Sequence, residues 1–139
     1  MTGGCSVGGM TTADLLHADV TATVLSAYFR VYNQLGPGFL ESVYAASLAV
    51  ELTTRGVKYV RECPTTVYYD GHPVGRFVAD LIVERRVLVE LKAVETMHDA
   101  HGRQVVNYLL ATGVQVGLLL NFGAARPQFR RFVGRARSE

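Results

Sequence analysis

Two apolar runs, each interrupted by one acidic residue, constrain the fold of this chain more than any other feature. The first run covers residues 77–83 and contains Asp80, and the second covers residues 87–94 and contains Glu90. Runs of this length and composition predict β-strands, and the polar residues 84–86 between them predict a turn. If the strands turn around Arg85, residues 80 and 90 both lie five positions from the apex. The pattern therefore predicts an antiparallel hairpin in which Asp80 faces Glu90.

The strand pattern also predicts which side chains share a face of this hairpin. Successive side chains point to opposite faces, so Glu90 and Lys92 share one face and Leu91 lies on the other. Like charges opposed across a sheet are destabilising, and a cation between Asp80 and Glu90 would remove that repulsion. Two carboxylates and a backbone carbonyl, here that of Leu91, are ligands that Mg²⁺ prefers. Lys92 would then orient an attacking water or neutralise charge on a phosphate.

A surface ion pair is the alternative explanation for these charged residues. An Asp–Lys or Glu–Lys pair at a sheet edge is the commonest role for such side chains. Both carboxylates, however, lie inside runs that otherwise look buried, and charges in such runs need partners. The sequence therefore favours a chemical site over the ion pair.

The rest of the chain predicts one α/β domain with a mixed sheet and helices on its faces. Apolar spacing predicts helices over residues 20–35, 39–55 and 98–112, with Gly36-Pro37-Gly38 ending the first. Strands are expected over residues 57–63, 65–69, 72–83, 87–94 and 116–122, and a short one over 129–133. Asp70-Gly71 is a strong hairpin signal. The domain is expected over residues 13–139, after a glycine-rich flexible leader at residues 1–12.

Composition and charge exclude several classes of protein. Apolar residues make up 49% of the 139 residues and charged residues 19%, which excludes a disordered chain. The richest apolar stretch, residues 114–125, is interrupted by polar residues and glycines and is too short to span a membrane. The N-terminus lacks the pattern of a secretory signal, so Cys5 and Cys63 are expected to be free thiols in a reducing cytoplasm.

Arginines are concentrated at the C-terminal end of the chain. Residues 1–29 contain no Lys or Arg, and twelve of the fourteen basic residues of the chain are Arg. Arg is better suited than Lys to bidentate phosphate contacts, so this end indicates a polyanion such as nucleic acid. A solvated basic tail is an equally good explanation. The candidate phosphate-binding residues are Arg126, Arg130, Arg131, Arg135 and Arg137.

Two helices carry further candidates whose structural explanations are the stronger ones when each residue is taken alone. Glu41 lies in the first turn of a helix, where a capping role or the helix dipole would justify it, and Tyr44 suits a core aromatic. Gln104 and Tyr108 are four residues apart and so share a helix face, with His101 on the same side. An ordinary polar helix face would explain all three.

The ordered set of motifs resembles the GxxExxY family, a branch of the PD-(D/E)XK nuclease-like superfamily. The name-giving motif is Gly38, Glu41 and Tyr44, within residues 35–44. The similarity continues through residues 79–81, 89–95, 104–109 and 117–122 and covers about residues 20–122. It departs at Tyr32, at Phe77-Val78 and at Leu110, where the family commonly carries residues that could contact phosphate.

The resemblance implies a restriction-endonuclease-like fold with the core order αβββαβ and a central mixed sheet. It implies metal binding by Asp80 and Glu90 with help from Glu41, and catalysis by Lys92. It also implies that Gln104 and Tyr108 are active-site residues, because they match a Gln-x-x-x-Tyr signature of related exonucleases. The implied activity is a Mg²⁺- or Mn²⁺-dependent nuclease, with DNA as the expected substrate.

A module that keeps this fold without catalysis is the alternative function. It would bind nucleic acid or assemble with itself, since one fold hosts several functions. A chain of 139 residues has little room for a substrate channel, which a homodimer or larger ring would build. The intact set of Asp80, Glu90 and Lys92 favours the enzyme.

Overall fold

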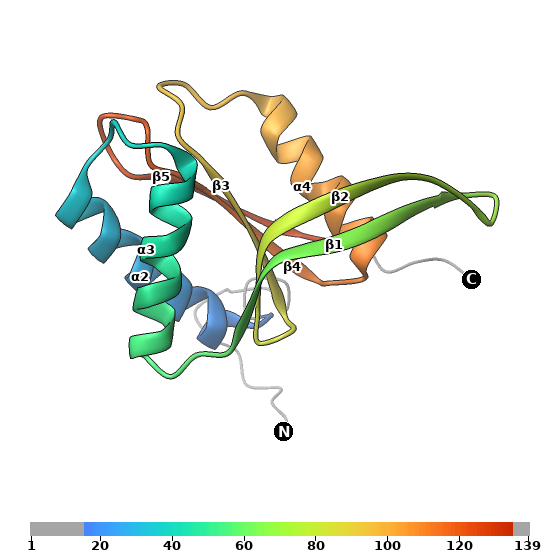
Figure 1. The fold of residues 1–139 in the computed structure, drawn as a ribbon, viewed down its shortest axis with the longest axis horizontal. Helices are drawn as coiled ribbons and strands as arrows, with labels where there is room; N and C mark the ends of the chain where they lie inside the picture. Colours follow the sequence, from blue (N-terminus) through green and yellow to red (C-terminus); the bar gives the residue numbers. More distant parts are fainter. Residues whose placement is uncertain (1–15, 135–139) are drawn as a thin grey trace, which may run out of the picture.

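The computed structural model describes residues 16–134, which form three helices and one five-stranded sheet. The sheet has the strand order β1-β2-β3-β4-β5; β3 and β4 are parallel, and every other neighbouring pair is antiparallel (Figure 1). The elements in chain order are α2 (Ala18–Leu35), α3 (Glu41–Thr54), β1 (Tyr59–Tyr69), β2 (His72–Val83), β3 (Val87–Lys92), α4 (Asp99–Thr112), β4 (Val116–Asn121) and β5 (Gln128–Val133).

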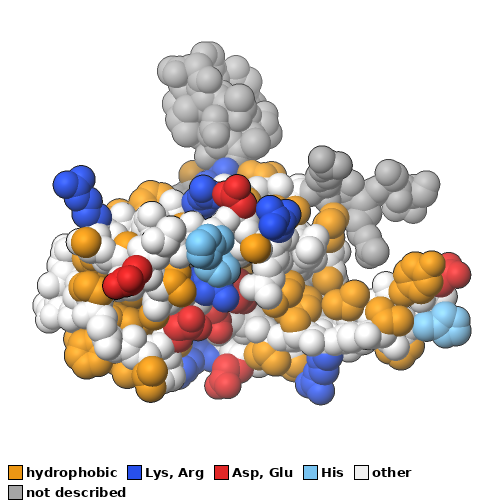
Figure 2. Space-filling model, turned by 90° about the horizontal axis from the view of Figure 1, so that it is seen from above, with side chains coloured by type: hydrophobic (Ala, Val, Ile, Leu, Met, Phe, Trp, Pro, Cys, Tyr) orange, Lys and Arg blue, Asp and Glu red, His pale blue; other side chains and the backbone are white. Residues whose placement is uncertain are grey.

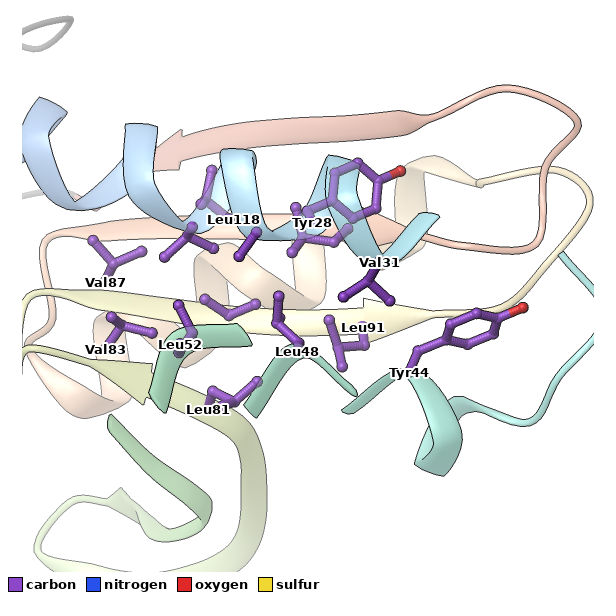
Figure 3. Close-up of a cluster of buried hydrophobic side chains, with 14 of the residues drawn as sticks. Tyr28, Val31, Tyr44, Leu48, Leu52, Leu81, Val83, Val87, Leu91 and Leu118 are labelled. Atoms are coloured by element: carbon purple, nitrogen blue, oxygen red, sulfur yellow. The ribbon is translucent and has the colours of Figure 1, made fainter. Parts of the chain in front are cut away.

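One face of the sheet is covered by α2 and α3. Apolar residues recur along α2 at helical spacing, and Val24, Ala27 and Tyr28 are completely buried against the sheet. Figure 3 shows Tyr28 and Val31 of this helix among the buried side chains. The strands contribute alternate residues to this core, among them Leu118 and Leu120 of β4. Burial of this apolar surface is the main stabilising term of the domain.

The opposite face is covered by α4 alone. Its buried cluster is small and contains Leu88, Leu119 and Ala79 from the strands and Val105 and Leu109 from α4. Leu119 therefore faces α4, while its neighbours Leu118 and Leu120 face α2 and α3. This is the alternation that a sheet covered on both faces requires.

The β1–β2 hairpin projects beyond the rest of the sheet (Figure 1). Only residues 81–83 of β2 pair with β3, so the outer part of β2 pairs with β1 alone. Asp70 and Gly71 at the tip both have positive φ, 53° and 79°, as a two-residue hairpin turn requires. The hairpin signal read from Asp70-Gly71 is confirmed.

The structure confirms the expected α/β fold and its mixed sheet, and α3-β1-β2-β3-α4-β4 follows the expected core order αβββαβ. The expectation of two strands over residues 57–63 and 65–69 is wrong, because β1 runs through Pro64. Since β1 is an edge strand, proline, which has no N–H to donate, is tolerated there. The short strand expected near residues 129–133 is β5.

Several expectations concern residues outside the described range. The expected leader at residues 1–12, together with Cys5, Arg135 and Arg137, lies there. Cys63 is a free thiol. Across residues 16–134, no helix is long and apolar enough to cross a membrane.

Candidate active site

Asp80 and Glu90 meet where β2 and β3 separate. The regular ladder between these strands ends at Leu81 and Val89, one position before the two acids. Beyond that point the side chains replace the backbone ladder: the Asp80 N–H donates to Glu90 Oε1 at 3.1 Å, and the Leu91 N–H donates to Asp80 Oδ2 at 2.8 Å. Asp80 and Glu90 therefore face each other, as the length of the hairpin predicts. Each carboxylate is fixed by a hydrogen bond from the opposite strand.

Glu90 is the more deeply buried of the two acids. Glu90 is only 6% exposed, and β3 is buried at every position except Lys92. Burial, the neighbouring Asp80 charge and a side-chain hydrogen bond with Asp80 raise the pKa of Glu90 to about 8, against the opposing effects of the Asp80 N–H and Lys92. The fold thus holds two carboxylates together although their charges repel, an arrangement that a bound cation would relieve.

A local distortion places a third acidic residue beside Asp80. Glu62 on β1 lies opposite Asp80 but does not pair with it, and its φ is 51°. At this point the alternation of β2 shifts by one residue: Ala79 packs in the α4 cluster and Leu81 in the α2–α3 cluster. A left-handed Glu within a strand costs about 1 kcal/mol or more. Glu62 was not singled out from the sequence, although a hairpin centred on Gly71 puts it opposite Asp80.

The residues around this distortion line a cavity of about 290 Å³. It lies between the start of α3 and the strands, so Glu41 and Asp80 open onto the same space. Arg61, the second residue missed from the sequence, brings a cation to it. The lining residues are Glu41, Ser42, Ala45, Arg61, Glu62, Asp80 and Leu91.

Tyr44 fixes the turn that leads into Glu41. Its hydroxyl donates to the Gly36 carbonyl at 2.5 Å and accepts from the Phe39 N–H at 3.1 Å, and its ring stacks on Phe122 at 4.4 Å. Glu41 is the first residue of α3, and the N-cap Leu40 makes no side-chain capping bond. Tyr44 is a buried core aromatic, as the sequence indicates, and its hydroxyl also holds the loop before Glu41.

Lys92 is the last residue of β3 and is held by the neighbouring strand. Its carbonyl accepts from the Phe122 N–H at 2.8 Å, and it pairs with Asn121 in the parallel ladder. The buried Asn121 side chain then binds both backbone polar groups of Val94, accepting at 3.1 Å and donating at 2.9 Å. These bonds fix the course of the chain on either side of Lys92.

Three α4 side chains share the electrostatic environment of this site. Burial and the nearby charges of Glu90 and Asp80 raise the pKa of Tyr108, against a hydrogen bond from Gln104. Partial burial, Lys92 and His98 lower the pKa of His101, and the charge of Glu41 acts in the opposite direction. Figure 2 shows acidic, basic and histidine side chains gathered at the middle of the face seen from above. His101 also has a structural role, because its Nδ1 accepts from the His98 N–H at the start of α4.

The donor set fits a divalent cation in type but not as a complete cage. Carboxylate and carbonyl oxygens of Asp80, Glu90 and Leu91 are hard ligands of the kind that Mg²⁺ and Mn²⁺ prefer. Within the described residues no group of three His, Cys, Asp or Glu side chains is arranged to hold a metal ion. Mg²⁺ commonly keeps several waters and binds through one or two carboxylates, so two acids and a carbonyl suffice for it.

The C-terminal arginines that the structure describes lie on the other side of β3. Arg130 pairs with Asp99 at 3.6 Å, and Arg131 donates to the Leu16 carbonyl at 2.7 Å, so both contact the protein itself. Both belong to β5, which is separated from β3 by β4. Arg126 is exposed in the segment before β5.

Comparisons with known proteins identify the domain type. The model of a family described as the PD-(D/E)XK nuclease superfamily matches residues 18–132. A solved structure titled "Crystal structure of SSO0001" is similar over 69% of this chain and 50% of its own, with a TM-score of 0.56 and 17% identity, which supports the fold. This chain thus spans about half the length of that protein. None of the curated proteins matches the chain.

Proposed function

The chain belongs to the PD-(D/E)XK nuclease superfamily, and we propose that it is a nuclease that hydrolyses phosphodiester bonds in nucleic acid, with DNA as substrate, using Mg²⁺ or Mn²⁺. One observation carries the proposal: Asp80 and Glu90 accept hydrogen bonds from each other's strands, and the fold keeps them adjacent although this raises the pKa of Glu90 to about 8. Paired carboxylates with shifted pKa values are typical of functional sites, because catalysis requires pKa values matched to the reaction.

The residues that would hold the cation are Asp80, Glu90 and the Leu91 carbonyl, and Glu41 faces the cavity that Asp80 and Leu91 line. A divalent cation bound there supplies a Lewis acid that polarises the phosphate and lowers the pKa of water. Its charge would also keep Glu90 ionised at neutral pH, because an adjacent positive charge lowers the pKa of a carboxyl group.

The remaining candidates would act on the water and the phosphate. Lys92, one pleat beyond Glu90, would orient or deprotonate the attacking water, or neutralise the charge that develops on the scissile phosphate. Gln104 and Tyr108, which share a face of α4, would hold a phosphate oxygen or the water. Glu62 and Arg61 open onto the same cavity as Asp80 and would contact the same ligands.

The proposal extends to the family branch, the phosphate contacts, the oligomeric state and the location of the protein. Membership in the GxxExxY branch is favoured by Gly38, Glu41 and Tyr44. The arginines of β5, together with His101, would add phosphate contacts that make binding steeply dependent on salt. A homo-oligomer and a cytoplasmic location are also expected.

Cleavage of labelled single- and double-stranded DNA and RNA, with Mg²⁺ or Mn²⁺ and with EDTA, tests the proposal. We expect cation-dependent cleavage by the unaltered protein and a loss of about a hundredfold or more in Asp80→Ala and in Lys92→Ala, the loss typical of a removed acid–base or charge-stabilising group. Lys58→Ala is the matched control, because Lys58 is the only other lysine of the chain and its side chain is exposed.

The control should cleave at the rate of the unaltered protein. Equal losses in Lys58→Ala and Lys92→Ala would contradict a special role for Lys92. No cleavage of any substrate, together with no calorimetric signal for either cation, would favour the alternative of a non-catalytic module that binds nucleic acid or assembles with itself.

A further inference from the structure

A groove of about 540 Å³ runs between the projecting β1–β2 hairpin and α4. It is separate from the cavity that Asp80 and Glu41 line. One wall is the hairpin and the other is α4, and the two pack on each other. No charged side chain lines it. The lining residues are Thr66, Val67, Tyr68, Phe77, Asn107, Tyr108, Leu110 and Ala111.

The groove presents aromatic rings in a fixed arrangement. Phe77 of β2 and Tyr108 of α4 lie almost parallel, with ring centroids 3.7 Å apart and an interplanar angle of 3°. Tyr68, near the hairpin tip, is 65% exposed, and Leu110 on the opposite wall is 40% exposed. An apolar and aromatic surface held open to water is typical of a binding site rather than of a core.

Tyr108 connects the groove with the candidate active site. This residue lines the groove and is also close enough to Glu90 and Asp80 for their charges to affect its hydroxyl. A ligand lying along α4 in the groove would therefore come close to the carboxylates at Tyr108, so one substrate would contact both.

A cation borders the α4 wall. Arg103 lies one helical turn before Asn107, so the two side chains share a face of α4. Arg103 is exposed, and within residues 16–134 it is not in an ion pair. Between residues 63 and 79 the hairpin carries a single acidic residue, Asp70 at its tip. Aromatic walls with a cation at the rim are complementary to a strand that offers both bases and phosphates.

We propose that this groove binds an unpaired strand of the nucleic-acid substrate, with bases stacked on Tyr68 and the Phe77–Tyr108 pair and phosphates contacted by Arg103. The inference rests on the proposed nuclease function and narrows its substrate class. An unpaired base offers its whole ring face for stacking, whereas base pairing and stacking hide that face inside a duplex. The occupant is therefore a single strand or a frayed end rather than a continuous duplex.

Binding measured in EDTA tests this without any dependence on cleavage. The probes are a fluorescein-labelled oligothymidine of about 12 nucleotides, within the site sizes of single-strand binding folds, and a duplex of equal length. We expect tighter binding of the single strand and about tenfold weaker binding by Tyr68→Ala, the usual cost of losing one stacking partner. Tyr69→Ala is the matched control, because Tyr69 is 73% exposed on the same hairpin but does not line the groove.

A second variant and a spectroscopic signal sharpen the test. Leu110→Glu puts a negative charge on the opposite wall and should also weaken single-strand binding by about tenfold, through repulsion of phosphates. A 2-aminopurine base in the strand should be quenched on binding, and Tyr68→Ala should reduce the quenching, because the signal reports stacking rather than charge alone.

Equal effects of Tyr68→Ala and Tyr69→Ala, preferred binding of the duplex, or an unquenched 2-aminopurine would each overturn the groove proposal. A dimer that dissociates in Tyr68→Ala, measured by sedimentation without nucleic acid, would also overturn it, because a second copy of the chain would then occupy the groove. Single-strand binding without any cleavage would contradict the nuclease function alone. Cleavage that prefers duplex and ignores Tyr68→Ala would contradict the groove alone.

Discussion

The two faces of the sheet differ in how completely they are packed. On the α2–α3 face, 18 buried residues form one cluster, and the hydroxyls of Tyr28, Tyr32 and Tyr44 are all hydrogen-bonded to backbone carbonyls. On the α4 face the cluster has five buried residues, surrounded by partly exposed ones such as Phe77 and Tyr108. The first face supplies most of the buried apolar area, and the second carries the open groove.

This difference places most of the stabilising core on one face of the sheet, whereas the candidate site draws on both faces: Glu41 and Asp80 share a cavity at the start of α3, and Gln104 and Tyr108 belong to α4. Leu91 points into the large cluster, whereas its neighbours Glu90 and Lys92 point the other way, so a single strand anchors the core and presents the site. Because the large cluster fixes β3, the repulsion between Asp80 and Glu90 and the strained backbone at Glu62 can be tolerated. Regions that bind ligands are commonly less stable than the core that positions them.

Adjacent leucines of β4 provide the largest test of this comparison. Leu118 and Leu119 are both completely buried, but they face the large and the small cluster respectively. We expect Leu118→Ala to lower the free energy of unfolding by about 4 kcal/mol and Leu119→Ala by about 2 to 3, because the sparser face can relax around the cavity. Urea denaturation of both variants measures this. An equal or larger cost for Leu119→Ala would show that the α4 face is at least as rigid as the α2–α3 face.

A smaller effect is expected at Gly123, which follows β4. A methyl group there would lie 2.3 Å from the Val94 nitrogen and 2.5 Å from the Ala93 carbonyl carbon, so backbone has to move. Gly123→Ala should cost about 2 kcal/mol of stability, as overpacking does, and should reduce cleavage by displacing the segment after Lys92. Gly75→Ala on the hairpin is the control, because nothing lies within 4 Å of a methyl group there. Unchanged cleavage in Gly123→Ala would contradict a positioning role for this contact.

The smallest effect is expected from removing one buried hydroxyl of the large cluster. The Tyr28 hydroxyl donates to the Asn121 carbonyl at 2.6 Å and accepts from the Gln128 N–H at 2.8 Å. Tyr28→Phe should lower the free energy of unfolding by about 1 to 2 kcal/mol at pH 8, because both bonds are lost inside the core.

The pH dependence of this loss has a definite sign. Burial raises the pKa of Tyr28 from 10.0 to about 12, so the folded state keeps a proton that the unfolded chain releases at lower pH. The contribution of the hydroxyl is complete below pH 10 and is lost as the pH rises towards 12. The difference between the unaltered protein and Tyr28→Phe, measured by denaturation at pH 8 and 11, should therefore shrink. A difference that grows with pH would contradict the assignment.

Much of the fold follows from local patterns. The helix boundaries, the Asp70-Gly71 turn and the turn around Arg85 could be predicted because spacing, capping and turn residues act over a few positions. The facing of Asp80 and Glu90 needed only the length of one short hairpin. The resemblance of the ordered motifs indicated the superfamily, which the match over residues 18–132 establishes.

Other features depended on contacts between distant segments. In the sequence, Pro64 indicates a break between two strands. Only the sheet order shows that β1 is an edge strand, where proline is tolerated. The sequence indicates that Tyr44 is a core aromatic. Only the folded chain shows that its hydroxyl holds the loop between Gly36 and Phe39. Glu62 and Arg61 gave no motif, because their place beside Asp80 results from a distortion shared by two strands.

The sequence by itself thus determined the elements, the hairpin register and the type of chemistry that Asp80, Glu90 and Lys92 could perform. The tertiary structure alone decided which face of the sheet is densely packed, which acids share a cavity, and that a groove lies between the hairpin and α4. The physical reason is that strand alternation and turn geometry act within a few residues, whereas burial, pKa shifts and grooves arise where segments far apart in the chain pack together.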